Sequence, residues 1–349
     1  NHAEFVYKNA FILPDVSDPK CLKELNELCS RLSIDFIFPA NSVVIDFLID
    51  NRNLIKYPIL QPNSDIVRLI RSKRRTYKTF EKYNITPEVF DKKTGNYIFP
   101  IFAKPDSSYG SKGARIINSV SDLPSNLNDE DIVLTEFLPG DEHTIECFSN
   151  SNELLYVFSR TRERIRMGTS MRSCQSSEAI QSVAENYAEI IFKELKIDGL
   201  WFIQIKKSVD GIYKLLEVES RVPGTMCLSR NRGANLPLAE IYYRSNKNFN
   251  FNLNNSVSLL LDRSLSNKFK SNIEYEKVFV DLDDTIIVNG KINIPLISFL
   301  YQCVNDGVPI FLITKSIEKE LFQYLEKFKI TNIFDEIIHI KESDYKSNY

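Results

Sequence analysis

The first part of the chain alternates between amphipathic helical segments and short apolar ones. Leucines recur at helical spacing between Pro19 and Leu32, and the apolar residues 34–39 predict a short buried strand. Further helical patterns cover residues 41–50 and 65–83. An alternation of helices with buried strands predicts a parallel α/β layer.

From Tyr97 onwards the pattern changes to short segments with the periodicity of strands. We expect strands at residues 97–104, 114–118, 132–137, 144–149, 154–159, 199–206 and 212–218. One long helical pattern, residues 176–195, interrupts them. Strand pairs with a helix on one side indicate an α+β unit. Residues 245–256 are rich in Asn and Ser and predict a loop or linker.

A fresh strand–helix–strand pattern begins at Val278 and runs to Thr314, which predicts a second α/β domain. The length of 349 residues is enough for two or three domains. The chain is 43% hydrophobic and 26% charged, the composition of an ordinary globular protein with a sizeable core.

The charge and cysteine content exclude several classes of function. A net charge of −2 gives no sign of a nucleic-acid or membrane-surface partner, although basic runs occur at residues 71–75 and 160–166. The six cysteines form no Cys-x-x-Cys pair, which argues against a zinc site and a disulfide framework. No apolar run reaches the ~20 residues that span a bilayer. We therefore expect a cytoplasmic protein with neither kind of partner.

Two acidic side chains, Glu217 and Glu219, lie two residues apart near the end of a predicted strand. If that strand forms a hairpin with residues 199–206, Gln204 joins them on one face, because side chains alternate along strands. Carboxylates this close repel each other unless a cation lies between them, and oxygen ligands suit magnesium. Arg221 follows and can neutralise a phosphoryl group. The alternative is a solvated hairpin edge.

Two further motifs are compatible with nucleotide binding. Lys104 ends an apolar strand and leads into a loop with Gly110 and Gly113, where a cation and accessible backbone N–H groups could hold phosphates. The usual P-loop order is absent, and a plain β-turn is the alternative. After the next strand, backbone groups near Glu136 could contact an adenine, and Glu142 could accept ribose hydroxyls. Here the alternative is a charged turn.

The order and spacing of these motifs resemble the ATP-grasp superfamily, in the branch of the carbamoyl phosphate synthase large subunit. The resemblance covers roughly residues 14–244, and its matching stretches are FAKPDSSYGSKGARII, VLTEFLPGDEHTIE, GLWFIQIKK, LLEVESRVPGTM and GANLPLAEI. It implies that Lys73 and Lys104 hold the phosphates of ATP and that a loop closes over them. The loop residues implied to bind the nucleotide are Ser107, Gly110, Ser111 and Gly113.

The same resemblance assigns the rest of the site. It implies Glu136 and Leu138 at the adenine and Glu142 at the ribose. The implied ligands of Mg²⁺ (or Mn²⁺) are Gln204, Glu217 and Glu219. Arg221 would steady the transferred phosphoryl group. The family usually has Asn at the position of Glu219, so this carboxylate is a departure that bears on metal affinity and on activity.

The implied reaction joins a small-molecule carboxylate to an amine. The carboxylate attacks the γ-phosphate of ATP, and the amine intercepts the resulting acyl phosphate, so catalysis rests on positioning and charge neutralisation. An alternating arginine run is expected on one strand face, as a clamp for an anionic acceptor or as a solvated surface. Its members are Arg160, Arg162, Arg164 and Arg166. A homodimer remains open.

The second domain begins with an apolar strand that ends in the sequence DLDDT. This resembles the first motif of haloacid dehalogenase (HAD)-like phosphotransferases, with Asp281 as nucleophile and magnesium ligand and Asp283 as general acid/base. Thr314, at the end of the next strand, would bind phosphate. The family's lysine would be Lys346 or, less well, Lys341. A helix N-terminal acidic cap is the alternative for DLDDT.

Together the resemblances predict an α/β and α+β chain in three parts. A truncated, Rossmann-like pre-ATP-grasp layer occupies residues 1–72 and lacks its N-terminal part. An ATP-grasp domain follows at residues 73–265, and a partial HAD-like α/β domain without its C-terminal part at residues 274–349. The favoured function is an ATP- and Mg²⁺-dependent carboxylate–amine ligase. The alternatives are a HAD-type phosphatase with a nucleotide-sensing ATP-grasp module and a non-catalytic nucleotide-binding protein.

Overall fold

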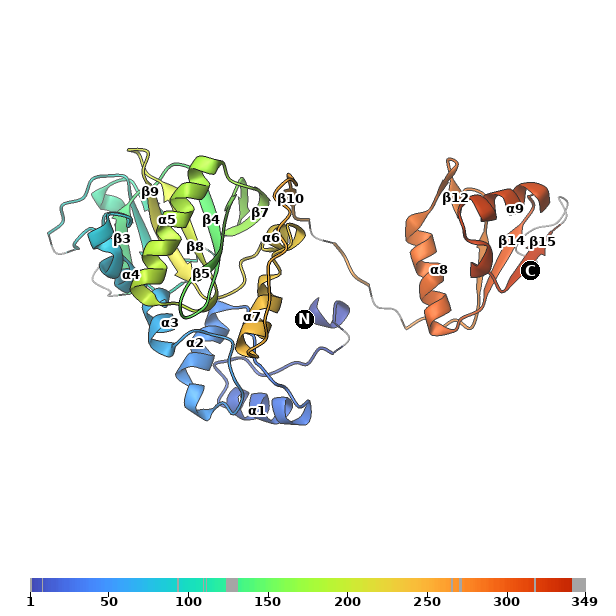
Figure 1. The fold of residues 1–349 in the computed structure, drawn as a ribbon, viewed down its shortest axis with the longest axis horizontal. Coiled ribbons are helices and arrows are strands. Elements are labelled where there is room, and N and C mark those ends of the chain that lie inside the picture. The colour runs from blue at the N-terminus through green and yellow to red at the C-terminus, as the bar shows by residue number, and fades with distance from the viewer. Residues whose placement is uncertain are drawn as a thin grey trace. The chain divides into compact units, whose positions relative to one another are not determined.

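The fold was obtained as a computed structural model (Figure 1). It describes residues 2–7, 9–92, 94–108, 110, 112–123, 131–264, 266–269, 272–316 and 318–340. The chain divides into two compact units. The large unit comprises Asn1–Asn267 and the small unit Lys268–Tyr349.

Short helices dominate the first part of the large unit. They are η1 (His2–Phe5), α1 (Cys21–Arg31), α2 (Ser42–Asp50), η2 (Arg52–Leu54), α3 (Ser64–Arg71), α4 (Lys73–Phe80) and η3 (Glu81–Tyr83). Side chains cap α2, α3 and α4, because Asn41, Asn63 and Ser72 each accept a hydrogen bond from a backbone N–H in the first turn. These caps fix where the helices begin, and so place Ser42 and Lys73 at helix N-termini.

The strand predicted at residues 34–39 is reduced to one parallel bridge, between Ile37 and Ile59. Pro39 and Pro58 lie next to the two bridging segments and have no N–H to donate. The ladder therefore cannot extend, and the expectation of a full strand there is wrong. The helices predicted at residues 19–32, 41–50 and 65–83 are confirmed as α1, α2 and the succession of α3, α4 and η3, with outer bounds that differ by at most two residues.

A four-stranded antiparallel sheet with the order β5-β4-β8-β9 forms the centre of the large unit. Its strands are β4 (Glu142–Ser149), β5 (Leu154–Thr161), β8 (Gly199–Lys207) and β9 (Tyr213–Glu219). The long helix α5 (Glu178–Leu195) covers one face (Figure 1). Ala188 and Ile191 of α5 belong to the same buried core as Trp201, Ile203 and Ile205 of β8. Because side chains alternate, Gln204 is directed to the opposite face.

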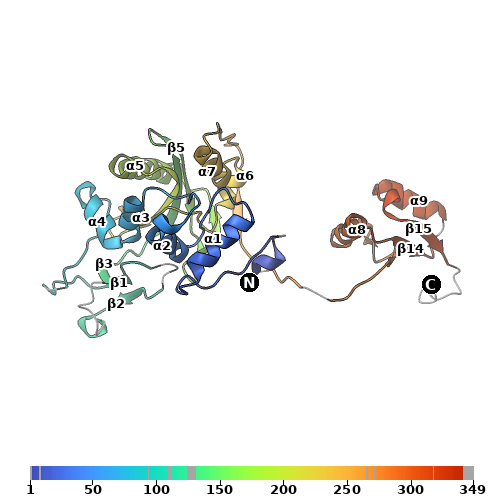
Figure 2. The ribbon, with the colours of Figure 1, turned by 90° about the horizontal axis from the view of Figure 1, so that it is seen from below.

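Two smaller antiparallel sheets complete the large unit. One has the order β2-β1-β3, from β1 (Ile101–Pro105), β2 (Arg115–Ile117) and β3 (Ile132–Glu136), and Figure 2 shows it near α4. The other has the order β10-β7-β6, from β6 (Arg164–Arg166), β7 (Thr169–Cys174) and β10 (Leu260–Asp262). The remaining elements are η4 (Val120–Asp122), α6 (Cys227–Asn231) and α7 (Leu236–Arg244). The loop predicted at residues 245–256 contains neither helix nor strand.

The small unit is a parallel sheet with helices. Strands β11 (Val278–Asp281), β14 (Ile310–Thr314) and β15 (Glu336–His339) pair in that order, which confirms the predicted strand–helix–strand pattern. The other elements are β12 (Ile287–Val288), β13 (Lys291–Ile292), α8 (Ile294–Asp306), α9 (Glu318–Lys327) and η5 (Thr331–Ile333). Leu282, Leu300 and Leu312 belong to a core of its own. Over the described ranges of both units, no helix is long and apolar enough to traverse a bilayer.

Candidate active site

A cavity of about 430 Å³ lies in the large unit, on the face of the central sheet that carries Gln204. Its walls come from β1, β3, β8 and β9, from the N-termini of α2 and α4, and from the turn between β6 and β7. Many of the residues predicted from the sequence line it. They are Lys73, Lys104, Gly110, Glu136, Leu138, Glu142, Gln204, Glu217 and Arg221.

The predicted hairpin between β8 and β9 is confirmed. Gln204 lies directly opposite Glu217, and Phe202 opposite Glu219, with an irregularity in the ladder after Gln204. The side chains of Gln204 and Glu217 are half-buried, line the cavity, and make no hydrogen bond or ion pair within the described part of the chain. One amide oxygen and one carboxylate are therefore presented together, as a hard cation requires.

Two lysines from different elements approach the same cavity. The Lys104 ammonium is buried and donates to Tyr77 Oη at 2.7 Å, and Tyr77 in turn donates to the carbonyl of Leu216. Burial, with a smaller contribution from the charge of Lys73, lowers the pKa of Lys104 to about 7. Lys73 Nζ donates to Asp106 O at 3.2 Å, and burial lowers its pKa as well. Both ammonium groups lack full hydration, so an anionic ligand would gain from contact with them.

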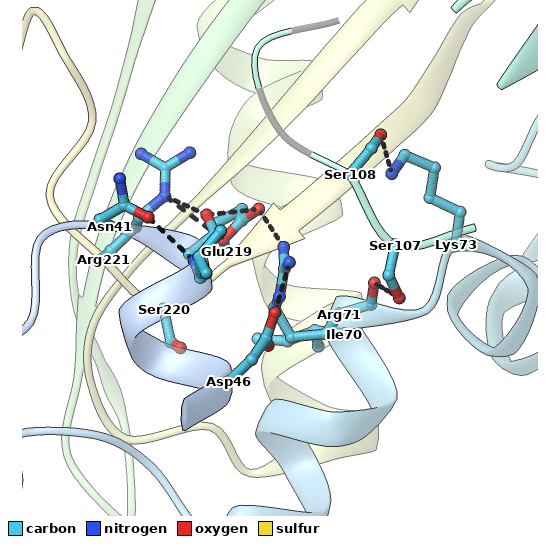
Figure 3. Close-up of polar contacts among 12 residues, drawn as sticks. Asn41, Asp46, Ile70, Arg71, Lys73, Ser107, Ser108, Glu219, Ser220 and Arg221 are labelled. Carbon is cyan, nitrogen blue, oxygen red and sulfur yellow. Dashed lines mark hydrogen bonds and ion pairs between the residues drawn. The ribbon is translucent and has the colours of Figure 1, made fainter. Parts of the chain in front are cut away.

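Glu219 lies between two arginines, Arg71 and Arg221 (Figure 3). Its carboxylate is 3% exposed and lies 3.0 Å from Arg71 Nη1 and 3.4 Å from Arg221 Nε. Ser42 Oγ also donates to it, at 3.3 Å. Arg71 makes a bidentate pair with Asp46 through its other nitrogens, at 2.8 and 2.9 Å. Burial and the nearby charge of Glu217 raise the pKa of Glu219.

The cavity wall also contains the residues predicted for adenine and ribose. Glu136 Oε1 accepts from the backbone N–H of Glu88 at 2.9 Å, and the backbone of Glu136 donates back to Glu88 O. Leu138 is buried in the wall. Glu142 forms an ion pair with Arg162, with 2.7 Å between Oε1 and Nε. These residues add a buried apolar side chain and two carboxylates held by protein contacts to the wall.

Sequence and structural comparisons identify the central part of the large unit. Residues 128–258 match the family described as ATP-grasp in the biosynthetic pathway with Ter operon. This segment is similar to the ATP-grasp family. The predicted resemblance to that superfamily is thereby confirmed, whereas its narrower branch is not distinguished. No curated protein matches the chain significantly in sequence.

Several solved structures share the fold of the ATP-grasp domain at low sequence identity. N5-carboxyaminoimidazole synthetase from Staphylococcus aureus, in complex with ADP, is 16% identical with a TM-score of 0.56, over 68% of this chain and 66% of that one. The biotin carboxylase domain of Hydrogenobacter thermophilus 2-oxoglutarate carboxylase, with MgADP, ADP and bicarbonate, is 14% identical with a TM-score of 0.55, over 67% and 59%.

An L-amino acid ligase from Bacillus licheniformis is also similar, at 16% identity and a TM-score of 0.52, over 64% of this chain and 59% of that one. The chain thus spans less than two thirds of the length of each of these three structures. At such identities the likeness establishes the fold of the domain.

The three residues predicted to bind the metal do not all face the cavity. Within the described residues, no three His, Cys, Asp or Glu side chains are grouped closely enough to hold a metal ion. Gln204 and Glu217 face the cavity together, whereas Glu219 is turned into its arginine contacts and is not part of the cavity wall.

The loop predicted to close over phosphates is described in part. Ser107 Oγ donates to Arg71 O at 3.2 Å, and Gly110 lines the cavity. Gly110 and Gly113 have φ values of +59° and +76°, the left-handed region that glycine enters freely. Gly113 does not line the cavity, and Ser111 lies outside the described residues.

The expectation that the alternating arginines share one strand face is wrong. Arg160 lies in β5 and is buried against Glu146 at 2.7 Å, while Arg164 and Arg166 belong to β6 in another sheet. The chain leaves β5 after Thr161, so the alternation does not continue along one strand. Of this run, only Arg162 lines the cavity.

The sequence interpretation missed Arg71, Ser42 and Lys206 at this site. Lys206 and Ser42 line the cavity, and Arg71 lies behind it against Glu219. The basic run at residues 71–75 was a signal for Arg71, but nothing local connects it with Glu219, which is 148 positions away. Ser42 had no signal beyond its place at the start of a helical pattern.

In the small unit, the residues predicted for a phosphotransferase lie at one edge of the parallel sheet. Asp281 and Thr314 are the last residues of the neighbouring strands β11 and β14. Asp283 accepts a hydrogen bond from Ser316 Oγ at 2.7 Å, and Thr314 Oγ1 accepts one from Ser316 N at 3.0 Å. Lys341 and Lys346 lie outside the described residues.

Proposed function

We propose that the large unit is an ATP- and Mg²⁺-dependent carboxylate–amine ligase of the carbamoyl phosphate synthase-like branch, which acts through an acyl phosphate. The observation that carries this proposal is the cavity beside the β8–β9 hairpin. It combines two poorly hydrated lysines, the side chains of Gln204 and Glu217 and an arginine, from segments far apart in the sequence.

Each group in the cavity has a role in this proposal. Lys73 and Lys104 bind the phosphates of ATP, because ammonium groups buried in a protein bind anions more strongly than those in water. Ser107 and Gly110, from the loop predicted to close over ATP, bind the phosphates through backbone N–H groups. Glu136 and Leu138 bind the adenine. Glu142 accepts hydrogen bonds from the ribose hydroxyls, and its ion pair with Arg162 then rearranges or shares the carboxylate with the ribose.

The residues present fit a magnesium ion. The oxygens of Gln204 and Glu217 face the cavity and have no hydrogen-bond or ion-pair partner among the described residues. Mg²⁺ is usually bound by one or two carboxylates together with phosphate oxygens. When bound, the ion, or Mn²⁺ in its place, supplies positive charge that offsets the charge of the phosphoryl group. Glu219 does not fit this role in the conformation described, because both of its oxygens contact other protein groups.

The chain's own residues then position the reactants. A substrate carboxylate attacks the γ-phosphorus, the bond from that phosphorus to the bridging oxygen breaks, and ADP leaves. An amine attacks the acyl phosphate and displaces phosphate. Arg221 and Arg162 line the cavity and supply positive charge for the phosphoryl group and for an anionic substrate. No nucleophilic side chain is needed.

The experiment that tests this proposal is a screen for ADP release with small carboxylates, amino acids included, in the presence of amines. We expect ADP release to depend on both an acid and an amine, and to fall by at least two orders of magnitude in Glu217→Gln. Glu153→Gln, an exposed change far from the cavity, is the matched control. Absence of ADP release with every acid, in protein shown to bind ATP, would contradict the ligase and favour a non-catalytic nucleotide-binding protein.

A second function is proposed for the small unit, a HAD-like phosphatase. The supporting observation is the placement of Asp281, Asp283 and Thr314 at one edge of a parallel sheet. Asp281 would be the nucleophile and a magnesium ligand, Asp283 the general acid/base, and Thr314 with Lys346 would hold the phosphate. Phosphate release from small phosphate esters should be lost in Asp281→Asn and kept in Glu217→Gln. Loss in both variants would contradict separate sites.

The finer organisation follows from the same proposals. We infer a Rossmann-like pre-ATP-grasp layer at residues 1–72, an ATP-grasp domain at 73–265 and a HAD-like domain at 274–349. A cytoplasmic location, with small-molecule substrates and no nucleic-acid or membrane partner, agrees with the charge and cysteine content. A homodimer is open to measurement by light scattering.

A further inference from the structure

A chain of alternating charges runs beside the cavity, from Asp46 through Arg71 and Glu219 to Arg221 (Figure 3). Its members come from α2, α3 and the end of β9, so it joins the N-terminal helices to the ATP-grasp hairpin. The two central members are nearly inaccessible to solvent, with Arg71 9% and Glu219 3% exposed. Buried charges of this kind persist only when each one is paired.

The carboxylate of Glu219 has no oxygen left for a cation. Oε1 contacts Arg71 Nη1, and Oε2 contacts both Arg221 Nε and Ser42 Oγ. Glu217, two residues earlier on the same strand, faces the cavity and makes no such contact within the described residues. A metal ion at Glu219 would have to displace a buried guanidinium, whereas one at Glu217 displaces only water.

The contacts of Glu219 also determine how Arg221 is presented. The Nε of Arg221 is directed to Glu219 and Ser42, and its guanidinium lies 5.1 Å from the ring centre of Phe202. Figure 3 shows the two terminal nitrogens of Arg221 directed away from Glu219. Nη1 contacts only the carbonyl of Val222, at 3.4 Å, and Nη2 has no hydrogen-bond partner in the described part of the chain. The end of the side chain that lines the cavity is therefore free to bind an anion.

We propose that Glu219 is a positioning residue and not a metal ligand: it holds Arg221 towards the transferred phosphoryl group and neutralises Arg71 behind it. This inference rests on the proposed ligase site and departs from the metal role that the sequence resemblance implied. Of the three residues in that implied set, Gln204 and Glu217 alone then hold the metal. Without the carboxylate, two guanidinium groups would face each other with no anion between them, and the mobile one, Arg221, would move away.

Two binding measurements separate the two roles of a carboxylate at position 219. The first is the affinity for Mn²⁺ in the presence of ADP, by electron paramagnetic resonance. The second is the affinity for MgADP with aluminium fluoride, a mimic of the transferred phosphoryl group, relative to MgADP alone. In Glu219→Gln we expect Mn²⁺ affinity within twofold of the unsubstituted protein and at least a tenfold loss of the gain from aluminium fluoride. Glu217→Gln should lose at least tenfold in Mn²⁺ affinity.

Arg221→Met provides the matched comparison. It should lose the aluminium fluoride gain to the same degree as Glu219→Gln, and the double variant should lose no more, because both changes remove one interaction. A general loosening of the fold would instead weaken MgADP itself. A tenfold loss of Mn²⁺ affinity in Glu219→Gln would overturn the inference and leave the ligase proposal intact.

Arg71→Met removes the other member of the Arg71–Glu219 ion pair. This variant replaces Glu219→Gln as the test if Glu219→Gln does not fold. The inference expects unchanged Mn²⁺ affinity, because Arg221 still occupies Glu219. If Glu219 were a metal ligand, release from Arg71 would instead raise Mn²⁺ affinity, and that result would overturn the inference. Failure of the unsubstituted protein to bind MnADP at all would contradict the proposed function, a different outcome.

Discussion

Lys104 carries a proton whose presence depends on pH in the neutral range. Burial lowers its pKa from 10.5 to about 7, so a large fraction of the free protein has a neutral amine there above pH 7. An anionic ligand favours the ammonium form. We therefore predict that nucleotide binding one or two pH units above 7 takes up about one proton per site, and that uptake disappears one unit below.

Calorimetry of ADP binding in buffers of different ionisation enthalpy measures this uptake. Lys104→Met is the control, because it removes the titrating group and keeps an unbranched side chain in the wall. Proton uptake of the same size in the variant would show that another group is responsible.

The same shift predicts how stability varies with pH. The unfolded chain binds a proton at Lys104 up to about pH 10.5 and the folded chain only up to about 7, so the contribution of Lys104 to stability rises as pH increases through that window. Below about pH 7 Lys104 is protonated in both states, so the full cost of burying its charge lowers the free energy of unfolding. Lys104→Met should therefore raise the free energy of unfolding at pH 6, on the order of 1 kcal/mol or more, and the gain should shrink above pH 8. Urea unfolding at the two pH values measures it.

At the scale of elements, the loop near Gly110 approaches the β6–β7 turn very closely. A Cβ at Gly168 would lie 2.5 Å from the carbonyl carbon of Gly110, and Gly168 has φ +73°. Gly211, in the β8–β9 turn, has φ +88°, but a Cβ there meets only Lys207 Cε, at 3.9 Å. Alanine at either position strains the backbone by about 1 kcal/mol, but at Gly168 it also displaces the loop.

We therefore predict that Gly168→Ala weakens ADP binding by at least fivefold, whereas Gly211→Ala leaves it unchanged. Both should lower the free energy of unfolding by about 1 kcal/mol. Fluorescence titration with a labelled nucleotide and urea unfolding provide the two measurements. Equal affinities in the two variants would mean that the loop tolerates displacement.

The elements themselves were largely predictable, because the strands of the hairpin and the long helix α5 have clear periodicity. The strand at residues 34–39 was not, since its prolines limit pairing to one bridge. Motif order singled out Lys104, Gln204 and Glu217, which line one cavity in the structure. It could not locate the partners of Glu219, because an ion pair between residues 148 positions apart depends on the packing of α3 against β9. The prediction that the four arginines share one strand face was wrong for a related reason, because the alternation of residues gives no sign that β5 ends at Thr161.

At the scale of the whole molecule, each unit has a hydrophobic core of its own. Leu300, fully buried on α8, packs with residues of the small unit, and Ile191, fully buried on α5, packs with residues of the large one. Truncation of a buried Leu or Ile to Ala removes packing worth about 2–5 kcal/mol.

We predict that Leu300→Ala speeds amide hydrogen exchange in β11 and β14 and leaves β4 and β8 unchanged. Ile191→Ala should give the opposite pattern. Hydrogen-exchange mass spectrometry on the whole chain reports both regions in one sample. Faster exchange in all four strands after either change would mean that the two cores open as one cooperative unit.

The pairing of Arg71 with Glu219 has a consequence for how the sequence varies among homologous chains. Replacement of Glu219 alone by a neutral amide would leave Arg71 with Asp46 as its one carboxylate partner. Replacement of Arg71 alone would remove one of the two cations that neutralise the buried carboxylate of Glu219. Either single step passes through a less stable protein. Positions 71 and 219 should therefore covary among homologous chains: a carboxylate at 219 should accompany a cation at 71, and a neutral residue at one should accompany a neutral residue at the other.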